Sequence, residues 1–214
     1  MFPEPPVPGR FRLFLLRHGH LENSDRGAIN GQADVFLSPR GLSQMERRAK
    51  DLAGVPVTLL LSSSLSRTRQ SLEPLARTRP ELVPRALDRF RERSFGAWEG
   101  KTRPEITRED PAGFDRWQKL DLSFAPAGGE SLLDFRGRIK RAMDDLLLEV
   151  GYGHNAILVA HSGVNRILLL DALGADLSRY FRLTQAYGAL NVIDYTEGGE
   201  PTVLLMNHTP EEFT

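Results

Sequence analysis

Short apolar runs alternate with longer amphipathic stretches along this chain. Three of the runs have the length of buried strands, at residues 11–16, 58–61 and 156–160. Four stretches carry apolar residues at helical spacing, at residues 39–52, about 65–76, 130–150 and 164–173. Such alternation is typical of an α/β fold with largely parallel strands. We therefore predict a three-layer sandwich in which helices flank a central, mostly parallel sheet.

A few residues predict the ends and inward faces of these helices. Ser38 before Pro39 has the pattern of an N-cap followed by proline at the first helical position, and Gly54 is expected to end that helix. Its inward face is predicted to hold Leu42, Met45, Ala49 and Leu52. The inward face of the helix over 130–150 is predicted to hold Leu133, Ile139, Met143, Leu146 and Leu147. Residues 190–195 and 202–206, on either side of a glycine-containing turn, predict a closing hairpin.

Length and proline content indicate how the chain is divided. A chain of 214 residues with 40% hydrophobic content is long enough for one good core. Residues 1–10 are rich in proline and predict an extended N-terminal tail, and residues 11–214 are expected to form a single domain. Prolines at 80, 84, 104 and 111 make residues 78–125 the least regular part. We interpret 78–125 as an excursion that carries lid or specificity residues.

Charge and cysteine content exclude several kinds of partner. The chain has 28 basic and 28 acidic residues, so its net charge gives no reason to expect a nucleic-acid or membrane partner. It has no cysteine, which excludes disulfides and thiolate nucleophiles and is compatible with a reducing cytosol. No signal-peptide pattern is present at the start. We expect a cytoplasmic protein, and a homodimer is one option for its oligomeric state.

Candidate chemistry lies where each of the three predicted strands ends. The first run ends at Arg17-His18-Gly19, the second opens into a serine-rich stretch that reaches Arg67, and the third ends at His161-Ser162-Gly163. Ligands of open α/β sheets bind beyond the carboxyl ends of the strands. The sequence therefore predicts that two arginines and two histidines meet in one anion-binding site.

Six motifs in this order resemble those of the histidine phosphatase superfamily, also called phosphoglycerate mutase-like. They are Arg17-His18-Gly19, Gly31–Asp34 with Leu37–Gly41, Ser63–Arg67, Glu92–Gly100, Gly129–Ser131 and Val159–Arg166. The resemblance covers roughly residues 11 to 173 and implies a phosphoglycerate mutase-like fold. It also implies a small phosphorylated metabolite as substrate.

The resemblance implies a role for each of these side chains. His18 is expected to attack phosphorus and form a phosphohistidine, with Arg17, Arg67 and His161 around the transferred group. Glu92 is expected to protonate the leaving oxygen and later to deprotonate water. Further contacts to phosphate or substrate are expected from Asn23, Gly31 and Ser162. The scheme needs no metal and no other cofactor, although His18-x-His20 is a conceivable pair of metal ligands.

Two departures from the family pattern bear on substrate choice more than on catalysis. The family commonly has Glu-Thr or Glu-Ser after Arg-His-Gly, whereas this chain has His20-Leu21. Ser24 stands where asparagine is usual, and a small loop shift would bring Asn23 to that place.

Several functions stay open at this point. The segment 95–100 resembles the short phosphatase branch, which includes α-ribazole phosphatases and sugar-phosphate phosphatases, so we predict hydrolysis of a small phosphate monoester. A phosphoglycerate mutase-type transfer is the first alternative, and a non-catalytic phospho-ligand binding protein on the same fold is the second. A serine hydrolase is conceivable from Ser62–Ser64, but the chain has no Gly-x-Ser-x-Gly motif.

Overall fold

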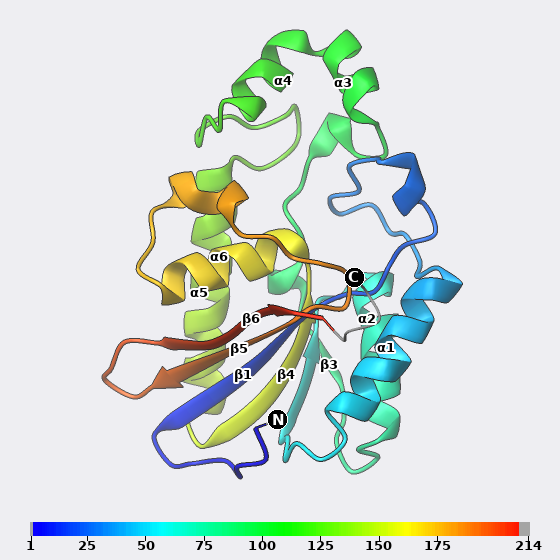
Figure 1. Ribbon diagram of the computed structural model, residues 1–214. Coiled ribbons are helices and arrows are strands. Elements are labelled where there is room, and N and C mark those ends of the chain that lie inside the picture. Colours follow the sequence, from blue (N-terminus) through cyan, green and yellow to red (C-terminus); the bar gives the residue numbers. More distant parts are fainter. Residues whose placement is uncertain (1, 210–214) are drawn as a thin grey trace.

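The computed structural model describes residues 2–209 and has a six-stranded sheet at its centre (Figure 1). The strands are β1 (Arg10–Arg17), β2 (Leu59–Ser62), β3 (Arg85–Ala86), β4 (His154–Ala160), β5 (Leu190–Thr196) and β6 (Thr202–His208). Their order is β3-β2-β4-β1-β5-β6. Strands β1 to β4 are parallel, whereas β5 pairs antiparallel with β1 and β6 pairs antiparallel with β5 at one side. The three predicted strands and the closing hairpin are confirmed, and the three strands end at the same edge.

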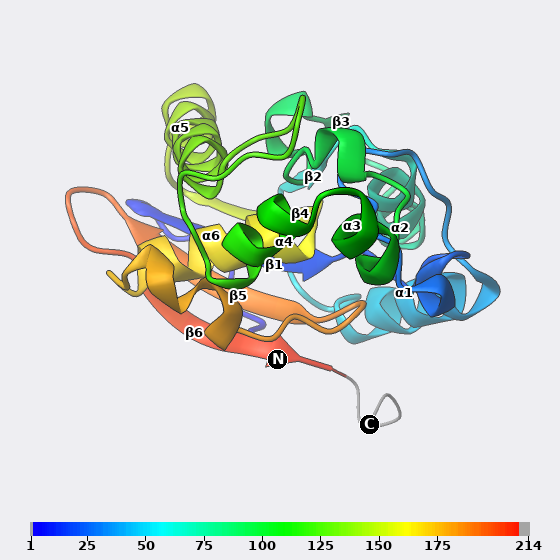
Figure 2. The ribbon, with the colours of Figure 1, turned by 90° about the horizontal axis from the view of Figure 1, so that it is seen from above.

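Helices cover both faces of this sheet, as predicted for a three-layer sandwich. Helices α1 (Pro39–Asp51) and α2 (Ser66–Arg77) lie on one face, and α5 (Leu132–Val150) and α6 (Ser162–Ala172) lie on the other (Figure 2). Helices α3 (Arg103–Glu109) and α4 (Pro111–Gln118) lie above the carboxyl ends of the strands (Figure 1). Short 3₁₀ turns complete the chain, namely η1 (Ser24–Arg26), η2 (Asp88–Phe90), η3 (Gly96–Trp98) and η4 (Leu177–Arg182). None of the helices in residues 2–209 combines the length and the apolar character that a membrane span needs.

The alternation of side chains along β1 divides the core into two layers. Phe11, Leu13 and Leu15 pack with apolar residues of α5 and α6, whereas Phe14 and Leu16 pack with those of α1 and α2. This is the period of two that a strand imposes when both of its faces are buried. A third, smaller apolar cluster lies under α3 and α4 and consists of Trp98, Ile106, Phe114 and Phe124.

The beginning of α1 is as predicted, but its end is not. The Ser38 hydroxyl accepts a hydrogen bond from the Gly41 amide at 3.1 Å, which is the expected N-cap. The helix ends at Asp51, because the following hydrogen bonds, from the Ala53 amide to the Lys50 carbonyl and from the Val55 amide to the Leu52 carbonyl, span three residues in place of four. Gly54 therefore lies beyond the helix and does not end it.

The inward faces of α1 and α5 differ from the prediction at two leucines. Leu133 is 48% exposed, because it lies six residues before Ile139 and therefore about 120° away from it around the axis of α5. Leu132 and Phe135 take its place in the core. Leu42 is 43% exposed at the flank of the α1 face that Met45 defines.

Residues 78–125 are more regular than the sequence predicts. They contain β3, η2, η3, α3 and α4. Two of the prolines that suggested irregular structure stand in the first turn of α3 and α4, where a missing amide hydrogen costs nothing. Thr102 and Glu105 form a capping box at α3, and the Asp110 side chain accepts from the Gly113 amide at α4.

The N-terminal residues form no helix or strand before Arg10, and they contact the sheet. Phe2 packs edge-on against Phe14 with ring centroids 6.1 Å apart. The Glu4 carboxylate pairs with Arg12, and its carbonyl accepts a hydrogen bond from Asn155. Strand β1 begins at Arg10, one residue before the predicted boundary.

Candidate active site

The predicted residues meet in a cavity of about 310 Å³ at the carboxyl ends of β1, β2 and β4. Six of its lining residues were predicted, namely Arg17, His18, Gly31, Arg67, Glu92 and Ser162. Seven were not, namely Leu21, Ala28, Ile29, Asn30, Phe95, Arg103 and Tyr187. His161 and Asn23 lie behind these lining residues and contact some of them.

His18 follows the last residue of β1 and is 4% exposed. Its Nδ1 lies 2.8 Å from the carbonyl oxygen of Gly19, so this nitrogen carries the hydrogen and donates it. Burial lowers the pKa of His18 well below its usual value, and the charges of Arg67 and Arg17 lower it further. The imidazole is therefore neutral near pH 7, with an unprotonated lone pair on Nε2.

Arg67 is 1% exposed and is held by backbone carbonyls of the loop that precedes α1. Its Nη2 donates to Gly31 at 2.5 Å and its Nη1 to Ala33 at 2.7 Å. The Asp34 carboxylate accepts from both the amide and the hydroxyl of Ser66, at 2.8 and 2.7 Å, where α2 begins. The motif Gly31–Asp34 therefore fixes both the start of α2 and the guanidinium that this helix carries.

Gly31 has a structural reason to be glycine. Its φ is +50°, and a Cβ atom there would lie 2.5 Å from a carboxylate oxygen of Glu99. Its carbonyl supports Arg67 while its backbone lines the cavity.

His161 precedes α6 and is fully buried, with its ring 5.3 Å from that of His18. Its Nδ1 accepts from Arg67 Nε at 3.2 Å, so its Nε2 carries the hydrogen and donates to Ser63 Oγ at 2.7 Å. Burial lowers the pKa of His161 well below its usual value, and the charge of Arg67 is the next cause. In this arrangement both ring nitrogens have hydrogen-bond partners, Arg67 and Ser63, and a direct contact between His161 and phosphate stays a prediction.

Arg17 ends β1 and lies beside the loop that precedes β5. Its Nη1 donates to the Gln185 carbonyl at 2.6 Å. The Gln185 side chain is fixed in turn, because its Oε1 accepts from Asn165 at 3.0 Å and from Asn191 at 2.9 Å. The Nε of Arg17 is buried without a hydrogen-bond partner, and a bound anion would satisfy it.

Glu92 is positioned by the first turn of α6. Its Oε2 accepts from the Gly163 amide and its Oε1 from the Arg93 amide, both at 2.9 Å. A Cβ atom on Gly163 would lie 2.2 Å from Glu92 Oε1, so only glycine allows this approach. These contacts orient the carboxylate in the cavity that also holds His18.

Ser162 and Asn23 differ in how directly they reach the cavity. Ser162 is the first residue of α6 and lines the cavity, where the positive end of the helix dipole favours anions. Asn23 instead exchanges two amide hydrogen bonds with Asn30, at 2.7 and 3.1 Å, and Asn30 is the member that lines the cavity. The phosphate contact of Asn23 stays a prediction.

Tyr187 was not predicted, although the predicted closing hairpin gives a signal for it. Strand β5 pairs antiparallel with β1, so its beginning lies beside the carboxyl end of β1. Residues just before a closing antiparallel strand therefore reach the same edge as residues just after the parallel ones. Tyr187 stands three residues before β5.

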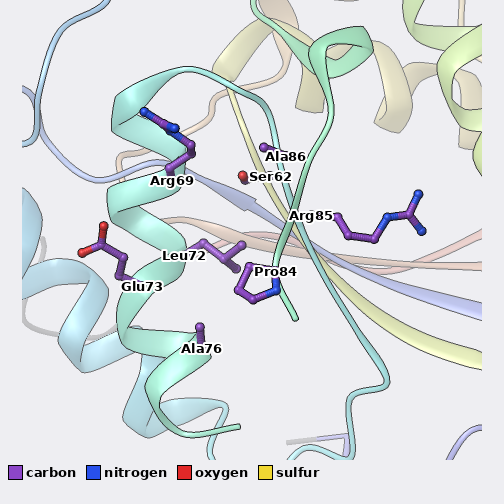
Figure 3. A pocket seen from close by; sticks show the side chains of 8 residues that line it. All are labelled: Ser62, Arg69, Leu72, Glu73, Ala76, Pro84, Arg85 and Ala86. Atoms are coloured by element: carbon purple, nitrogen blue, oxygen red, sulfur yellow. The ribbon is translucent and has the colours of Figure 1, made fainter. Parts of the chain in front are cut away.

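A second hollow, of about 180 Å³, lies between α2 and β3 (Figure 3). Leu72 and Pro84 lie on its two sides, and its lining includes none of the predicted site residues. Within residues 2–209 no three histidine or carboxylate side chains come together as a possible metal-ligand set. The convergence of His18 with the two arginines therefore defines the candidate active site.

Comparison with known proteins decides the family. The profile of the histidine phosphatase superfamily (branch 1) matches residues 13–209. The chain belongs to the histidine phosphatase superfamily. The match extends the resemblance found in the motifs to the closing hairpin, and the structure has the phosphoglycerate mutase-like fold.

Individual relatives of this histidine phosphatase chain are named for different functions. A bifunctional protein of Mycobacterium tuberculosis is 34% identical over 92% of this chain, but the chain spans only 54% of that protein. The adenosylcobalamin/α-ribazole phosphatase of Escherichia coli is 28% identical, over 87% of this chain and 91% of the relative. Glucosyl-3-phosphoglycerate phosphatase of Mycobacterium tuberculosis is 33% identical, over 78% of this chain and 74% of the relative.

Solved structures agree with this assignment. The α-ribazole phosphatase from Shigella flexneri superposes with a TM-score of 0.85 at 25% identity, over 92% of this chain and 96% of that one. The mycobacterial glucosyl-3-phosphoglycerate phosphatase superposes with a TM-score of 0.82 at 25% identity, over 94% of this chain and all of that one.

Proposed function

We propose that this histidine phosphatase chain is a metal-independent phosphatase that hydrolyses a small phosphate monoester through a phosphohistidine intermediate. The observation that carries the proposal is a neutral His18 with Nε2 unprotonated, in a cavity that Arg17 and Arg67 line. Relatives that are named phosphatases support it.

In the first step, Nε2 of His18 attacks phosphorus and a P–N bond forms while the ester P–O bond breaks. Arg17 and Arg67 stabilise the charge on the non-reacting oxygens of the phosphoryl group. Glu92 gives its proton to the leaving oxygen, and the alcohol departs.

In the second step, water attacks the phosphohistidine and loses a proton to the Glu92 carboxylate. The P–N bond breaks, its electron pair returns to His18, and inorganic phosphate leaves. Glu92 ends protonated, as it began, so the net reaction is hydrolysis of one ester bond.

We infer that the substrate is α-ribazole 5'-phosphate or a sugar phosphate. The substrates for which the relatives are named support these classes. Leu21, Ile29 and Phe95 give the cavity apolar walls suited to the face of a ring, and Arg103 adds a cation. Phe95 and Arg103 both belong to residues 78–125, which supports a role of that segment in substrate choice.

The first experiment is turnover of an aryl phosphate by the wild type and by His18→Ala, each with and without a chelator. We expect the wild type to remain active with the chelator and the variant to lose at least about 10³-fold in rate. Transfer of phosphate to a second alcohol in place of water would favour a mutase. Phosphate binding without turnover would favour a binding protein, and activity retained in His18→Ala would exclude the proposed nucleophile.

A further inference from the structure

Tyr187 enters the active-site cavity from the loop between η4 and β5, and the proposed reaction gives it no role. Its ring centroid lies 3.7 Å from Arg17 Cζ, so the guanidinium stacks on the ring face. The centroid also lies 5.7 Å from the ring of His18. The tyrosine thus touches the cation and lies beside the nucleophile.

Arg17 has few other contacts that fix its orientation. Its bond from Nη1 to a backbone carbonyl, that of Gln185, permits rotation about the N–H···O axis. Its Nε is buried and has no hydrogen-bond partner. One hydrogen bond leaves the guanidinium free to tilt about the N–H···O axis. A flat ring stacked on the guanidinium restricts this tilt. The ring face of Tyr187 is therefore the contact that sets the plane of the Arg17 guanidinium.

Tyr187 is itself fixed at both ends. The amide of the next residue, Gly188, donates to the His18 carbonyl at 3.1 Å. At the far end of the side chain, the Tyr187 hydroxyl accepts from Ser24 Oγ at 3.0 Å. Ser24 Oγ also accepts from the Leu21 amide at 3.0 Å, so the loop that carries η1 holds the ring.

The residues at which this chain departs from the family pattern surround the same side chain. Ser24 bonds to the Tyr187 hydroxyl, and the ring of His20 lies edge-on 5.2 Å from the Tyr187 ring. Leu21 lines the cavity beside it. The departures and Tyr187 therefore form one contact group.

We propose that Tyr187 is a positioning residue for Arg17, which holds the guanidinium plane so that its free N–H groups meet the oxygens of the transferred phosphoryl group. The inference rests on the proposed function, because that function places the phosphoryl group beside Arg17. Ser24 acts one step further away by holding the ring of Tyr187.

The test compares Tyr187→Leu, which removes the ring, with Tyr187→Phe, which keeps the ring and removes the hydroxyl. Tyr152→Leu is the matched control, because Tyr152 is also partly buried but lies before β4, at the opposite end of that strand from the site. We expect Tyr187→Leu to lower kcat/KM for an aryl phosphate by about 10- to 100-fold, mainly through kcat, as a misplaced catalytic group does. Tyr187→Phe is expected to stay within about threefold of the wild type, because it keeps the stacked face.

Affinity for inorganic phosphate gives a second readout that does not depend on turnover. It is expected to weaken in Tyr187→Leu and to stay near the wild-type value in Tyr187→Phe and Tyr152→Leu. If the wild type hydrolyses no ester, the proposed function fails, but this comparison still tests the contact with Arg17. Thermal unfolding of each variant shows whether it is folded, and Tyr187→Met replaces Tyr187→Leu if the latter is insoluble.

Two results would overturn the inference. If folded Tyr187→Leu keeps the wild-type kcat/KM and phosphate affinity, the ring of Tyr187 does not orient the Arg17 guanidinium. An equal loss in Tyr187→Phe and Tyr187→Leu would mean that the hydroxyl, and not the stacked face, is what matters.

Discussion

At His18, burial and two nearby guanidinium groups act in the same direction. Both disfavour the imidazolium form, so the pKa of the ring lies well below its usual value of 6.5. His161 experiences the same effects. In the proposed reaction the neutral imidazole attacks phosphorus, so the cations proposed to bind the phosphoryl group also keep His18 in its reactive form.

These lowered pKa values predict how stability depends on pH. Below about pH 6.5 the unfolded chain binds protons on His18 and His161, whereas the folded chain does not, so acid favours unfolding. The stabilising contribution is complete above pH 6.5 and is lost as the pH falls. Each histidine is expected to contribute up to about 1.4 kcal/mol per pH unit to this loss.

Urea unfolding of the wild type and of His18→Gln between pH 7.5 and 5, in a buffer without phosphate, measures this effect. The free energy of unfolding should fall less steeply with acid in His18→Gln. Equal slopes in the two proteins would show that His18 protonates as readily in the folded chain as in the unfolded one.

Glu92 leads to a prediction about the leaving group. Glu92→Gln keeps the shape of the side chain but has no proton to transfer. We expect about a 10²- to 10⁴-fold loss of kcat/KM with alkyl phosphates, whose leaving oxygens need that proton. Aryl phosphates should lose less kcat/KM, because their leaving oxygens need the proton less, and acid-labile phosphohistidine should accumulate from them. A uniform loss of kcat/KM across both ester types would contradict the role of Glu92 as the acid.

Among the elements, α2 has an unusual beginning, because the amide of its first residue, Ser66, is capped by a residue far away in the sequence. Leu65 provides no side-chain cap, and Asp34 accepts from Ser66 in its place. The loop over 31–34 thereby holds the helix and the Arg67 side chain together. Helix α5 begins more simply, with Ser131 as its own N-cap.

The variants Asp34→Ala and Ser131→Ala separate these two effects. Each should lose roughly 1–2 kcal/mol of unfolding free energy, because each removes the cap of one helix. Only Asp34→Ala should also lose activity, by about tenfold or more, since Arg67 then moves relative to His18. Thermal unfolding and aryl phosphate kinetics check both, and equal activity in the two variants would contradict the argument.

Local pattern predicted the strands and long helices outside residues 78–125, and it predicted side chains that follow the parallel strands. Arg17 and His18 could be found because the first apolar run ends on them, and Arg67 because the serine-rich stretch after the second run reaches it. On the inward face of α5, Leu133 was predicted but its neighbour Leu132 is the buried residue. The apolar pair alone does not indicate which of the two leucines faces the sheet. Asn30 was not predicted, because it reaches the cavity through a loop path that no short pattern encodes. Tyr187 was not predicted either, because its place follows only once the closing strand is known to pair antiparallel with β1.

On the scale of the whole molecule, three apolar clusters carry the fold. Two lie on the faces of the sheet, and the third, around Ile106, lies under α3 and α4. Ile106 and Leu158 are both fully buried, but Leu158 belongs to β4 and to a main cluster. Loss of packing at Ile106 should therefore affect only the segment around α3 and α4, whereas loss of packing at Leu158 should affect the whole chain.

Ile106→Ala is expected to loosen residues 95–125 without weakening the sheet. Cleavage by a protease within that segment should rise by about tenfold or more, while amide exchange in β1 and β4 stays as in the wild type. Leu158→Ala should instead destabilise the whole chain by about 2–5 kcal/mol. Increased exchange throughout the sheet of Ile106→Ala would show that the small cluster unfolds together with the rest.

The separate cluster under α3 and α4 also bears on how such a chain changes over evolutionary time. Phe95 and Arg103 lie in the segment that this cluster supports, whereas His18 and Arg67 are anchored in the sheet and its first helices. If that segment selects the substrate, as proposed, mutations there can change the substrate, while the reaction chemistry and the folding of the sheet with its flanking helices are inherited unchanged.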